Sequence, residues 1–299
     1  MKFFVLEVVI GGLLTGVLYS LVALGFVLIF KASGVFNFAQ GAMSLFAALA
    51  LVRLIEVMPA VLALAAAAAI MVAMAFAIER LVLRPLINQD GLVLFMATIG
   101  ITFFITGFGQ ALFGSDVYTL DLGIPKTPLI LFEPWVPGGI LVNEFDLWAA
   151  VMAGVLVAVL AVFFQRTRVG RALRAVADDH QAALSVGIPL RHIWVIVWGV
   201  AGLVALVAGV IWGSKLGVQF SIALVALKAL PVLMLGGLTS VPGAIVGGLL
   251  IGAGEKLSEV FLGPLLGGGI ENWFAYVLAL LVLLVRPQGL FGERIIERV

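Results

Sequence analysis

Long apolar stretches alternate with short polar ones along the whole of this chain of 299 residues. Lipid offers no hydrogen-bond partners, so each apolar stretch of about 20 residues predicts a membrane-spanning helix, which satisfies its own backbone. Nine such segments are expected, at residues 3–30, 36–52, 60–78, 92–113, 147–164, 193–213, 221–238, 243–261 and 272–285. We therefore predict an all-α, polytopic transmembrane helical bundle of about 8–10 membrane segments, some of them broken or partial helices.

Polar residues interrupt three of these segments. Asn37 and Gln40 lie at the head of the second, Lys228 and Pro231 interrupt the seventh, and Glu255 lies inside the eighth. Polar and charged side chains are costly in hydrocarbon and face a protein interior or a wet cavity. The four residues other than the proline are therefore candidates for lining a translocation path. Structural alternatives stay open: Asn37 as a helix cap, and an ion pair between Lys228 and Glu255.

Several of the 35 glycines recur at intervals of four residues. Examples are Gly12 with Gly16, and Gly248 with Gly252. This spacing exposes backbone along one helix face and lets a neighbouring helix approach closely. We expect these glycines to pack helices within the subunit rather than to bind a substrate.

Lysine and arginine gather in three regions, which follow the third, fifth and last apolar segments. Because basic loops stay in the cytoplasm, these regions are expected there. The loop at residues 115–146 carries five acidic residues against Lys126 and is expected outside. Nine crossings then place the N-terminus outside and the C-terminus in the cytoplasm.

The polar loops are too short to hold a core of their own, so residues 1–299 are expected to form a single permease domain. A weak internal repeat divides it into halves at about 1–145 and 146–299. Residues 24–41 and 207–224 both carry a glycine-bearing helix end, then a lysine, then Gly-Val and an aromatic residue. Transporters are often built from such repeats, with the path at their interface.

Composition excludes several classes of protein. Hydrophobic residues make up 64% and charged residues 11%, against roughly a half and a quarter in soluble domains, so a soluble enzyme is excluded. A net charge of +1 argues against nucleic-acid binding. With no cysteine and only two histidines, both in one polar loop, we expect no metal site and no cofactor in this chain. An intramembrane hydrolase lacks its nucleophile–base pair.

No phosphate-binding GxxxxGK[ST] run occurs, so the chain cannot itself bind ATP through a P-loop. Active transport would then draw on a partner ATPase or on an ion gradient. Ion-coupled carriers usually bury several acidic residues in mid-span. Only Glu255 is a plausible one here, which favours the ATPase.

The loop at residues 165–192 reads as a short amphipathic helix followed by a turn of small residues. Such a helix could dock into a cleft of a cytoplasmic partner, although an ordinary positively charged loop remains the plain alternative. The residues expected to couple the chain to an ATPase are Arg171, Arg174, Asp178, Asp179, Gln181, Ala182, Ala183 and Gly187.

Four blocks, in order, resemble the branched-chain amino acid importer permeases of the LivH type. They are residues 12–43, GRALRAVADDHQAALSVGI at 170–188, LKALPVLMLGGLTSVPGAIVGGLLIGAGE at 227–255 and RPQGLFG at 286–292. Within the second block, QAALSVG resembles the EAA-x-x-x-G signature with which permease subunits of ABC importers contact their ATPase. Gln181 stands where that signature has Glu, and Gln40 stands where the family commonly has a histidine.

The resemblance implies a multi-pass subunit of the bacterial inner membrane that is not itself an enzyme. Its implied protein partners are a second permease subunit of the LivM type, two cytoplasmic ATPase subunits that bind ATP and Mg, and a periplasmic substrate-binding protein. Membrane lipid and a small amino-acid substrate complete the implied partners. The implied function is ATP-driven import of branched-chain or related hydrophobic amino acids. Two alternatives stay open: an ABC permease for urea or short-chain amides, which share the same blocks, and an ion-coupled secondary carrier acting alone.

Overall fold

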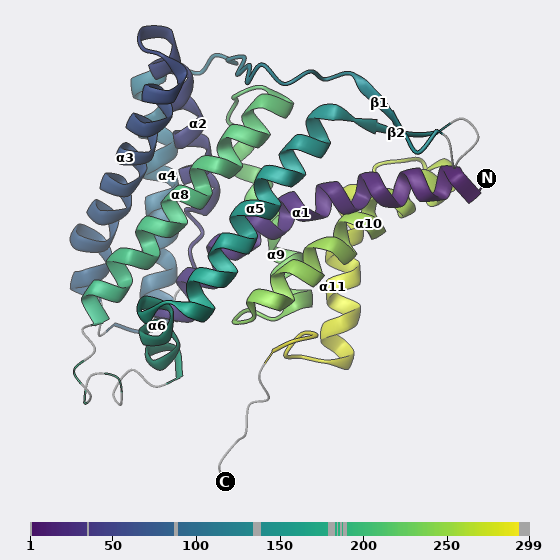
Figure 1. Ribbon diagram of the computed structural model, residues 1–299. Coiled ribbons are helices and arrows are strands. Elements are labelled where there is room, and N and C mark those ends of the chain that lie inside the picture. Colours follow the sequence, from purple (N-terminus) through teal and green to yellow (C-terminus); the bar gives the residue numbers. More distant parts are fainter. Residues whose placement is uncertain are drawn as a thin grey trace. The chain divides into compact units, whose positions relative to one another are not determined.

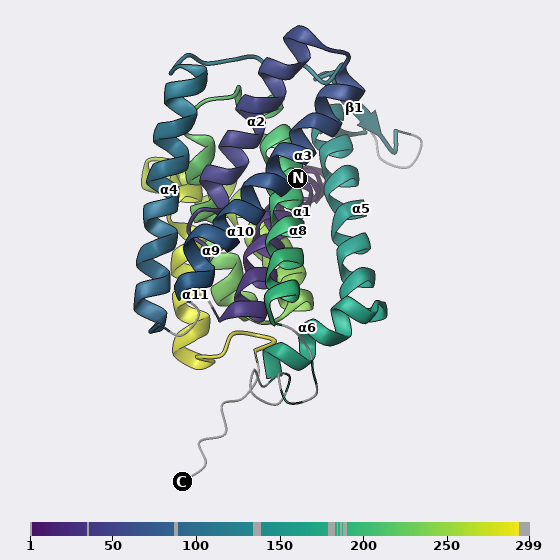
Figure 2. The ribbon, with the colours of Figure 1, turned by 90° about the vertical axis from the view of Figure 1, so that its left-hand side faces the viewer.

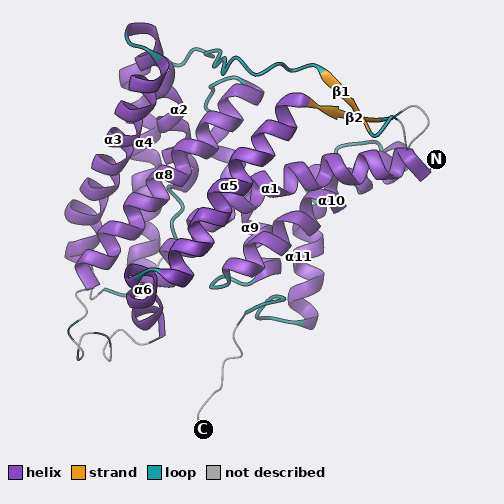
Figure 3. Ribbon diagram, viewed as in Figure 1, coloured by secondary structure: helices purple, strands orange, loops and turns teal. Residues whose placement is uncertain are grey.

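The computed structural model of the chain describes residues 2–34, 36–86, 89–133, 139–178, 183, 185, 187 and 190–292, and helices dominate them (Figures 1 and 3). The helices are α1 (Lys2–Ser33), α2 (Gln40–Val57), α3 (Ala60–Ile78), α4 (Gly91–Phe113), α5 (Glu144–Arg166), α6 (Arg168–Asp178), α8 (Leu190–Leu216), α9 (Ile222–Gly236), α10 (Val241–Leu266) and α11 (Phe274–Val285). A π-helix, η1 (Glu79–Leu83), and a 3₁₀ turn, η2 (Arg84–Leu86), continue α3, and a second 3₁₀ turn, η3 (Ile270–Asn272), precedes α11.

Each of the nine predicted apolar segments forms a helix, which confirms the polytopic helical bundle. In the part of the chain that the structure describes, six helices are long and apolar enough to cross a membrane: α1, α2, α3 with its continuation, α4, α5 and α8. The seventh and eighth predicted segments are α9 and α10, which meet at a bend of 115°. Lys228 and Pro231, expected to interrupt the seventh segment, both lie within the continuous helix α9, and the bend follows Gly236. The second segment is a continuous helix, and the ninth, α11, has only 12 residues.

The chain divides into two compact units. The first unit comprises Met1–Leu24, Leu122–Val157 and Lys228–Val299, and the second comprises Gly25–Asp121 and Ala158–Leu227. Each unit draws on both halves of the sequence, and α1, α5 and α9 contribute residues to both units. The repeat expected at 1–145 and 146–299 stays a prediction.

In the second unit, α2 is the buried helix and packs against α3, α4 and α8 (Figure 2). All of its residues from Gln40 to Val52 are buried. Small residues allow the close approach: Gly209 of α8 lies directly against the backbone of Ser44, and Gly202 lies against Met71 of α3. Helix α8 therefore holds α2 and α3 together through bare backbone.

In the first unit, the N-terminal part of α1 packs against α10. A Cβ atom built on Gly16 would lie 2.6 Å from the oxygen of Gly248, and one on Gly12 would lie 2.7 Å from the oxygen of Gly252. The predicted role of these glycines in helix packing is confirmed. Leucine or even alanine at these positions would push the two helices apart.

A short antiparallel hairpin of β1 (Pro128–Leu131) and β2 (Ile140–Asn143) lies in the segment expected outside the membrane. The register pairs Pro128 with Asn143 and Leu131 with Ile140. Ile140 and Val142 are buried on one face of the hairpin, against Ile10 and Leu14 of α1.

Candidate functional site

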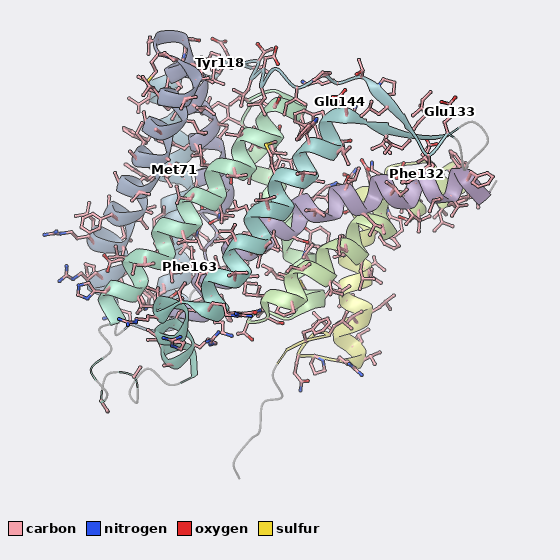
Figure 4. The ribbon with its side chains drawn as sticks, viewed as in Figure 1. Met71, Tyr118, Phe132, Glu133, Glu144 and Phe163 are labelled. Atoms are coloured by element: carbon pink, nitrogen blue, oxygen red, sulfur yellow. The ribbon has the colours of Figure 1, made fainter. Side chains whose placement is uncertain are left out.

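The corner between α5 and α6 is the candidate coupling site, because it carries the loop that the sequence singled out. Phe163, labelled in Figure 4, stands in the last turn of α5, and its carbonyl oxygen accepts a hydrogen bond of 2.6 Å from the Thr167 hydroxyl. The same hydroxyl accepts a hydrogen bond of 3.0 Å from the backbone N–H of Gly170. Thr167 thus caps the start of α6 while it is bonded to the end of α5.

Two of the predicted coupling residues also bind the end of α5. Arg174 donates from Nη1 to the carbonyl of Phe164 at 2.8 Å and from Nη2 to that of Gln165 at 3.4 Å. Arg171 donates to the carbonyl of Arg166 at 3.5 Å. The last carbonyls of a helix have no partner within the helix. The two guanidinium groups supply those partners and fix α6 to α5.

Gly170 closes the same corner and was not singled out from the sequence. A Cβ atom there would lie 2.5 Å from the carbonyl carbon of Phe164 and closer still to its oxygen. Because the obstacle is backbone, it cannot yield without moving one of the helices. The available signal was a glycine inside RVGRALRAVAD, where it weakens an otherwise favourable helix sequence.

The apolar face of α6 turns toward the chain itself. Leu173 and Val176 are 1% and 0% exposed, and α6 contacts α8. Arg171, by contrast, is exposed. The helix is amphipathic, as predicted, and lies on its own subunit with its charged side outward.

Gln181, Ala182, Ala183 and Gly187 form the predicted docking turn, and only part of it falls within the described residues. Asp178 is the last residue of α6. Ala183 is 2% exposed, so its methyl group faces the interior of this chain. Gly187 has a φ of +81° and nothing within 4 Å of a Cβ position. Asp179, Gln181 and Ala182 lie outside the described residues. Their contact with an ATPase stays a prediction.

Asn37 and Gln40 form a buried hydrogen-bonded group in the second unit, and both are 0% exposed. Gln40 donates to the carbonyl of Ala201 at 3.1 Å and accepts from Asn37 at 3.2 Å. Asn37 accepts from the backbone N–H of Ala39 at 3.1 Å. The residue that precedes α2 is Ala39, so the expectation that Asn37 caps this helix is wrong. Asn37 instead fixes the turn before it.

Glu255 and Lys228 belong to the first unit. Glu255 is 2% exposed, and its Oε2 accepts a hydrogen bond of 2.9 Å from the Tyr19 hydroxyl. Its Oε1 has no hydrogen-bond partner within the described part of the chain. Lys228 stands in α9, and Glu255 stands in α10. Among the described residues these two do not form an ion pair, so the structural alternative expected from the sequence is not found. Tyr19 was missed, although a buried tyrosine hydroxyl usually needs a partner.

The corner between α9 and α10 brings together two of the blocks named from the sequence. The backbones of Gly236 and Gly243 touch, so that neither has room for a side chain. Leu290 donates its N–H to the carbonyl of Leu235 at 2.8 Å, and Phe291 donates to that of Gly236 at 3.0 Å. The block at 286–292 thus satisfies the last carbonyls of α9.

The amino-acid sequence of the chain is similar to that of known proteins. The model of the family described as "Branched-chain amino acid transport system / permease component" matches residues 8–286. The high-affinity branched-chain amino acid transport system permease protein BraD of Pseudomonas aeruginosa is 30% identical over 98% of each chain. The corresponding LivH protein of Escherichia coli K12 is 29% identical over 98% of this chain and 97% of its own.

A more distant relative is the probable branched-chain amino acid transport permease protein LivH of Methanocaldococcus jannaschii, 26% identical over 94% of this chain and 91% of its own. No solved structure matches the chain significantly.

Proposed function

Because the chain belongs to the family of branched-chain amino acid transport system permease components, we propose that it is the permease subunit of an ATP-driven importer of branched-chain or related hydrophobic amino acids. The similar proteins BraD and LivH, both named as high-affinity branched-chain amino acid transport permeases, support that substrate class. The partners we propose are a second permease subunit of the LivM type, two ATPase subunits that bind ATP and Mg, and a periplasmic substrate-binding protein.

One observation carries the coupling part of this proposal: α6 is bonded to the end of α5. Side-chain hydrogen bonds from Thr167 and Arg174 and the backbone contact at Gly170 join the two helices. A force applied to α6 by a partner would therefore move α5 rather than bend the connection. A loose loop would absorb the same displacement.

The proposed mechanism follows from that connection. The proposed orientation has the N-terminus outside and the C-terminus in the cytoplasm. It places α6 and the docking turn on the cytoplasmic side, where they meet the ATPase subunits. ATP closes those subunits, α6 transmits the movement to α5, and helices packed through glycine rearrange so that the path opens to one side at a time. Asn37, Gln40, Lys228 and Glu255 remain our candidates for residues of the path.

The test uses the assembled transporter and two glycine variants. Gly170→Ala places a methyl group against the backbone of Phe164, whereas Gly199→Ala, in α8, adds one where nothing lies within 4 Å. We expect Gly170→Ala to retain ATP hydrolysis while amino-acid uptake per ATP falls about tenfold, the effect of roughly 1.4 kcal/mol of lost coupling. Gly199→Ala should leave the ratio unchanged.

Co-purification of the subunits shows whether the Gly170→Ala assembly survives. If it does and uptake per ATP equals that of the unmodified transporter, the α5–α6 corner does not transmit the movement. Gly187→Val probes the docking turn in the same assay, since a β-branched residue is strained at a φ of +81°. Unchanged coupling in that variant would contradict the assignment of Gly187.

A further inference from the structure

Two opposite charges in the first unit have no counter-charge among the residues that the structure describes. Lys228 in α9 is half-buried, and Glu255 in α10 is 2% exposed. Neither forms an ion pair with a described residue. A charged group removed from water is costly unless an opposite charge compensates it. Each of the two groups therefore requires a counter-charge from outside the described residues.

The other charged side chains of α10 already have partners. Lys256, the residue after Glu255, forms an ion pair of 3.2 Å with Glu271. Glu259 accepts a hydrogen bond of 3.0 Å from the backbone N–H of Glu271. In the Glu255 carboxylate, Oε2 accepts from the Tyr19 hydroxyl, whereas Oε1 is bonded to none of the described residues. Oε1 is therefore a buried acceptor that is still available for a ligand.

Lys228 and Glu255 stand on the two helices that form the corner between α9 and α10. Residues four apart share a helix face. One such stripe on each helix faces the other; the stripes consist of Lys228, Val232 and Gly236, and of Gly243, Gly247, Ile251 and Glu255. The stripes touch at Gly236 and Gly243. One turn further on, a Cβ atom on Gly247 would lie 2.7 Å from the carbonyl oxygen of Val232. Because the helices diverge from a bend of 115°, the two charged residues lie beyond these contacts, where the helices separate.

An amino-acid zwitterion carries both of the charges that these positions lack. Its ammonium group donates charge-assisted hydrogen bonds to a carboxylate, and its carboxylate accepts them from a lysine. A sodium ion would compensate Glu255 alone, and a chloride ion would compensate Lys228 alone. Either ion would leave the other charge uncompensated. A single zwitterion compensates both.

We propose that Glu255 and Lys228 bind the charged groups of the transported amino acid. The substrate ammonium lies on Oε1 of Glu255, and the substrate carboxylate lies on the ammonium group of Lys228. Tyr19 is a positioning residue, because its hydroxyl holds Oε2 and leaves Oε1 for the substrate. The inference rests on the proposed function as an amino-acid importer and assigns two residues to particular groups of the substrate.

The test measures leucine uptake by the assembled transporter in liposomes, with its binding protein and ATP. Glu255→Gln and Lys228→Met each remove one charge. We expect each to lower uptake per ATP hydrolysed at least about tenfold, as the loss of a hydrogen bond to a charged group does. ATP hydrolysis stimulated by the binding protein should persist. The control Lys256→Met removes the neighbouring lysine, which is paired with Glu271, and should leave uptake unchanged.

The double variant distinguishes substrate binding from an ion pair that forms between Lys228 and Glu255 when the helices move. Separate contacts with two groups of the substrate predict that the losses multiply, to about a hundredfold or more. An ion pair predicts that the double variant transports no worse than either single one. That result would overturn the proposal.

The same assay separates a failure of this site from a failure of the proposed function. If the unmodified assembly imports leucine and both single variants match its uptake per ATP, the site is wrong and the importer stands. If the unmodified assembly imports no leucine, the proposed function itself is wrong, and the site falls with it. Should Glu255→Gln not co-purify with its partner subunits, Lys228→Met decides alone, because Lys228 forms no ion pair with a described residue.

Discussion

The Glu255 carboxylate is buried and receives one hydrogen bond, from the hydroxyl of Tyr19. Its second oxygen has no hydrogen-bond partner among the residues that the structure describes. The Tyr19–Glu255 hydrogen bond therefore contributes to the stability of the fold, because a buried charged group that loses its partner bears the full cost of its desolvation.

We predict that Tyr19→Phe lowers the free energy of unfolding by about 1.5–3 kcal/mol, the usual worth of a hydrogen bond to a charged group. The measurement is thermal unfolding of the purified chain in detergent. Glu255→Gln and the double variant complete a double-mutant cycle. The loss at Tyr19 should shrink once the carboxylate is an amide. Strictly additive effects would show that the hydroxyl and the carboxylate are not coupled.

For Asn37 and Gln40, at the head of the second segment, the sequence predicted burial within protein but not the hydrogen-bond partners. The residue types alone indicated that Asn37 and Gln40 must be satisfied within protein. The partner of Gln40 is a backbone carbonyl 161 residues further along the chain. Every residue has a backbone carbonyl, and the sequence does not distinguish the one that binds Gln40. This partner could therefore not be predicted.

Close helix contacts in the first unit depend on glycine rather than on large apolar side chains. A Cβ atom on Gly16 would lie 2.8 Å from Cα of Leu249, which is backbone and cannot rotate away. Gly11 stands five residues earlier on the same helix with nothing within 4 Å. The two positions form a matched pair on α1.

We predict that Gly16→Ala destabilises the chain by about 1–3 kcal/mol, as overpacking does in a tight interior. Gly11→Ala should be neutral or stabilising by up to about 1 kcal/mol, because alanine favours the helix. Thermal unfolding in detergent measures both. Equal effects of the two substitutions would mean that α1 and α10 are not in close contact through Gly16.

The α9–α10 element was predictable only in part. Lys228 and Pro231 predicted an interruption within the seventh segment, but both lie inside α9, and the bend of 115° falls after them, between α9 and α10. The sequence did not show that residues 286–292 close this corner, since Leu290 and Phe291 bind it through their backbones. Their side chains are apolar like their surroundings and give no sign of the partner.

Across the whole molecule, segment positions were predictable and segment partners were not. Apolar runs predicted nine of the α-helices in the described part of the chain, all but the amphipathic α6, because hydrocarbon forces each of them to satisfy its own backbone. Nearly every face is apolar, however, so the pattern could not indicate which helices pack together. Gly170 and Thr167, which fix the coupling corner, were overlooked because a glycine and a threonine in a basic loop look ordinary.

We propose that partner ATPase subunits, and not an ion gradient, supply the energy for transport. In the part of the chain that the structure describes, Glu79 and Glu255 are the buried carboxylates, which is few for a carrier that binds protons or sodium in mid-span. We therefore expect liposomes with this chain alone to show no leucine uptake under a proton or sodium gradient. Uptake should require the second permease, the ATPase subunits, the binding protein and ATP. Gradient-driven uptake by the lone chain would contradict the coupling role of α6, and uptake of urea instead of leucine by the full assembly would change the substrate class alone.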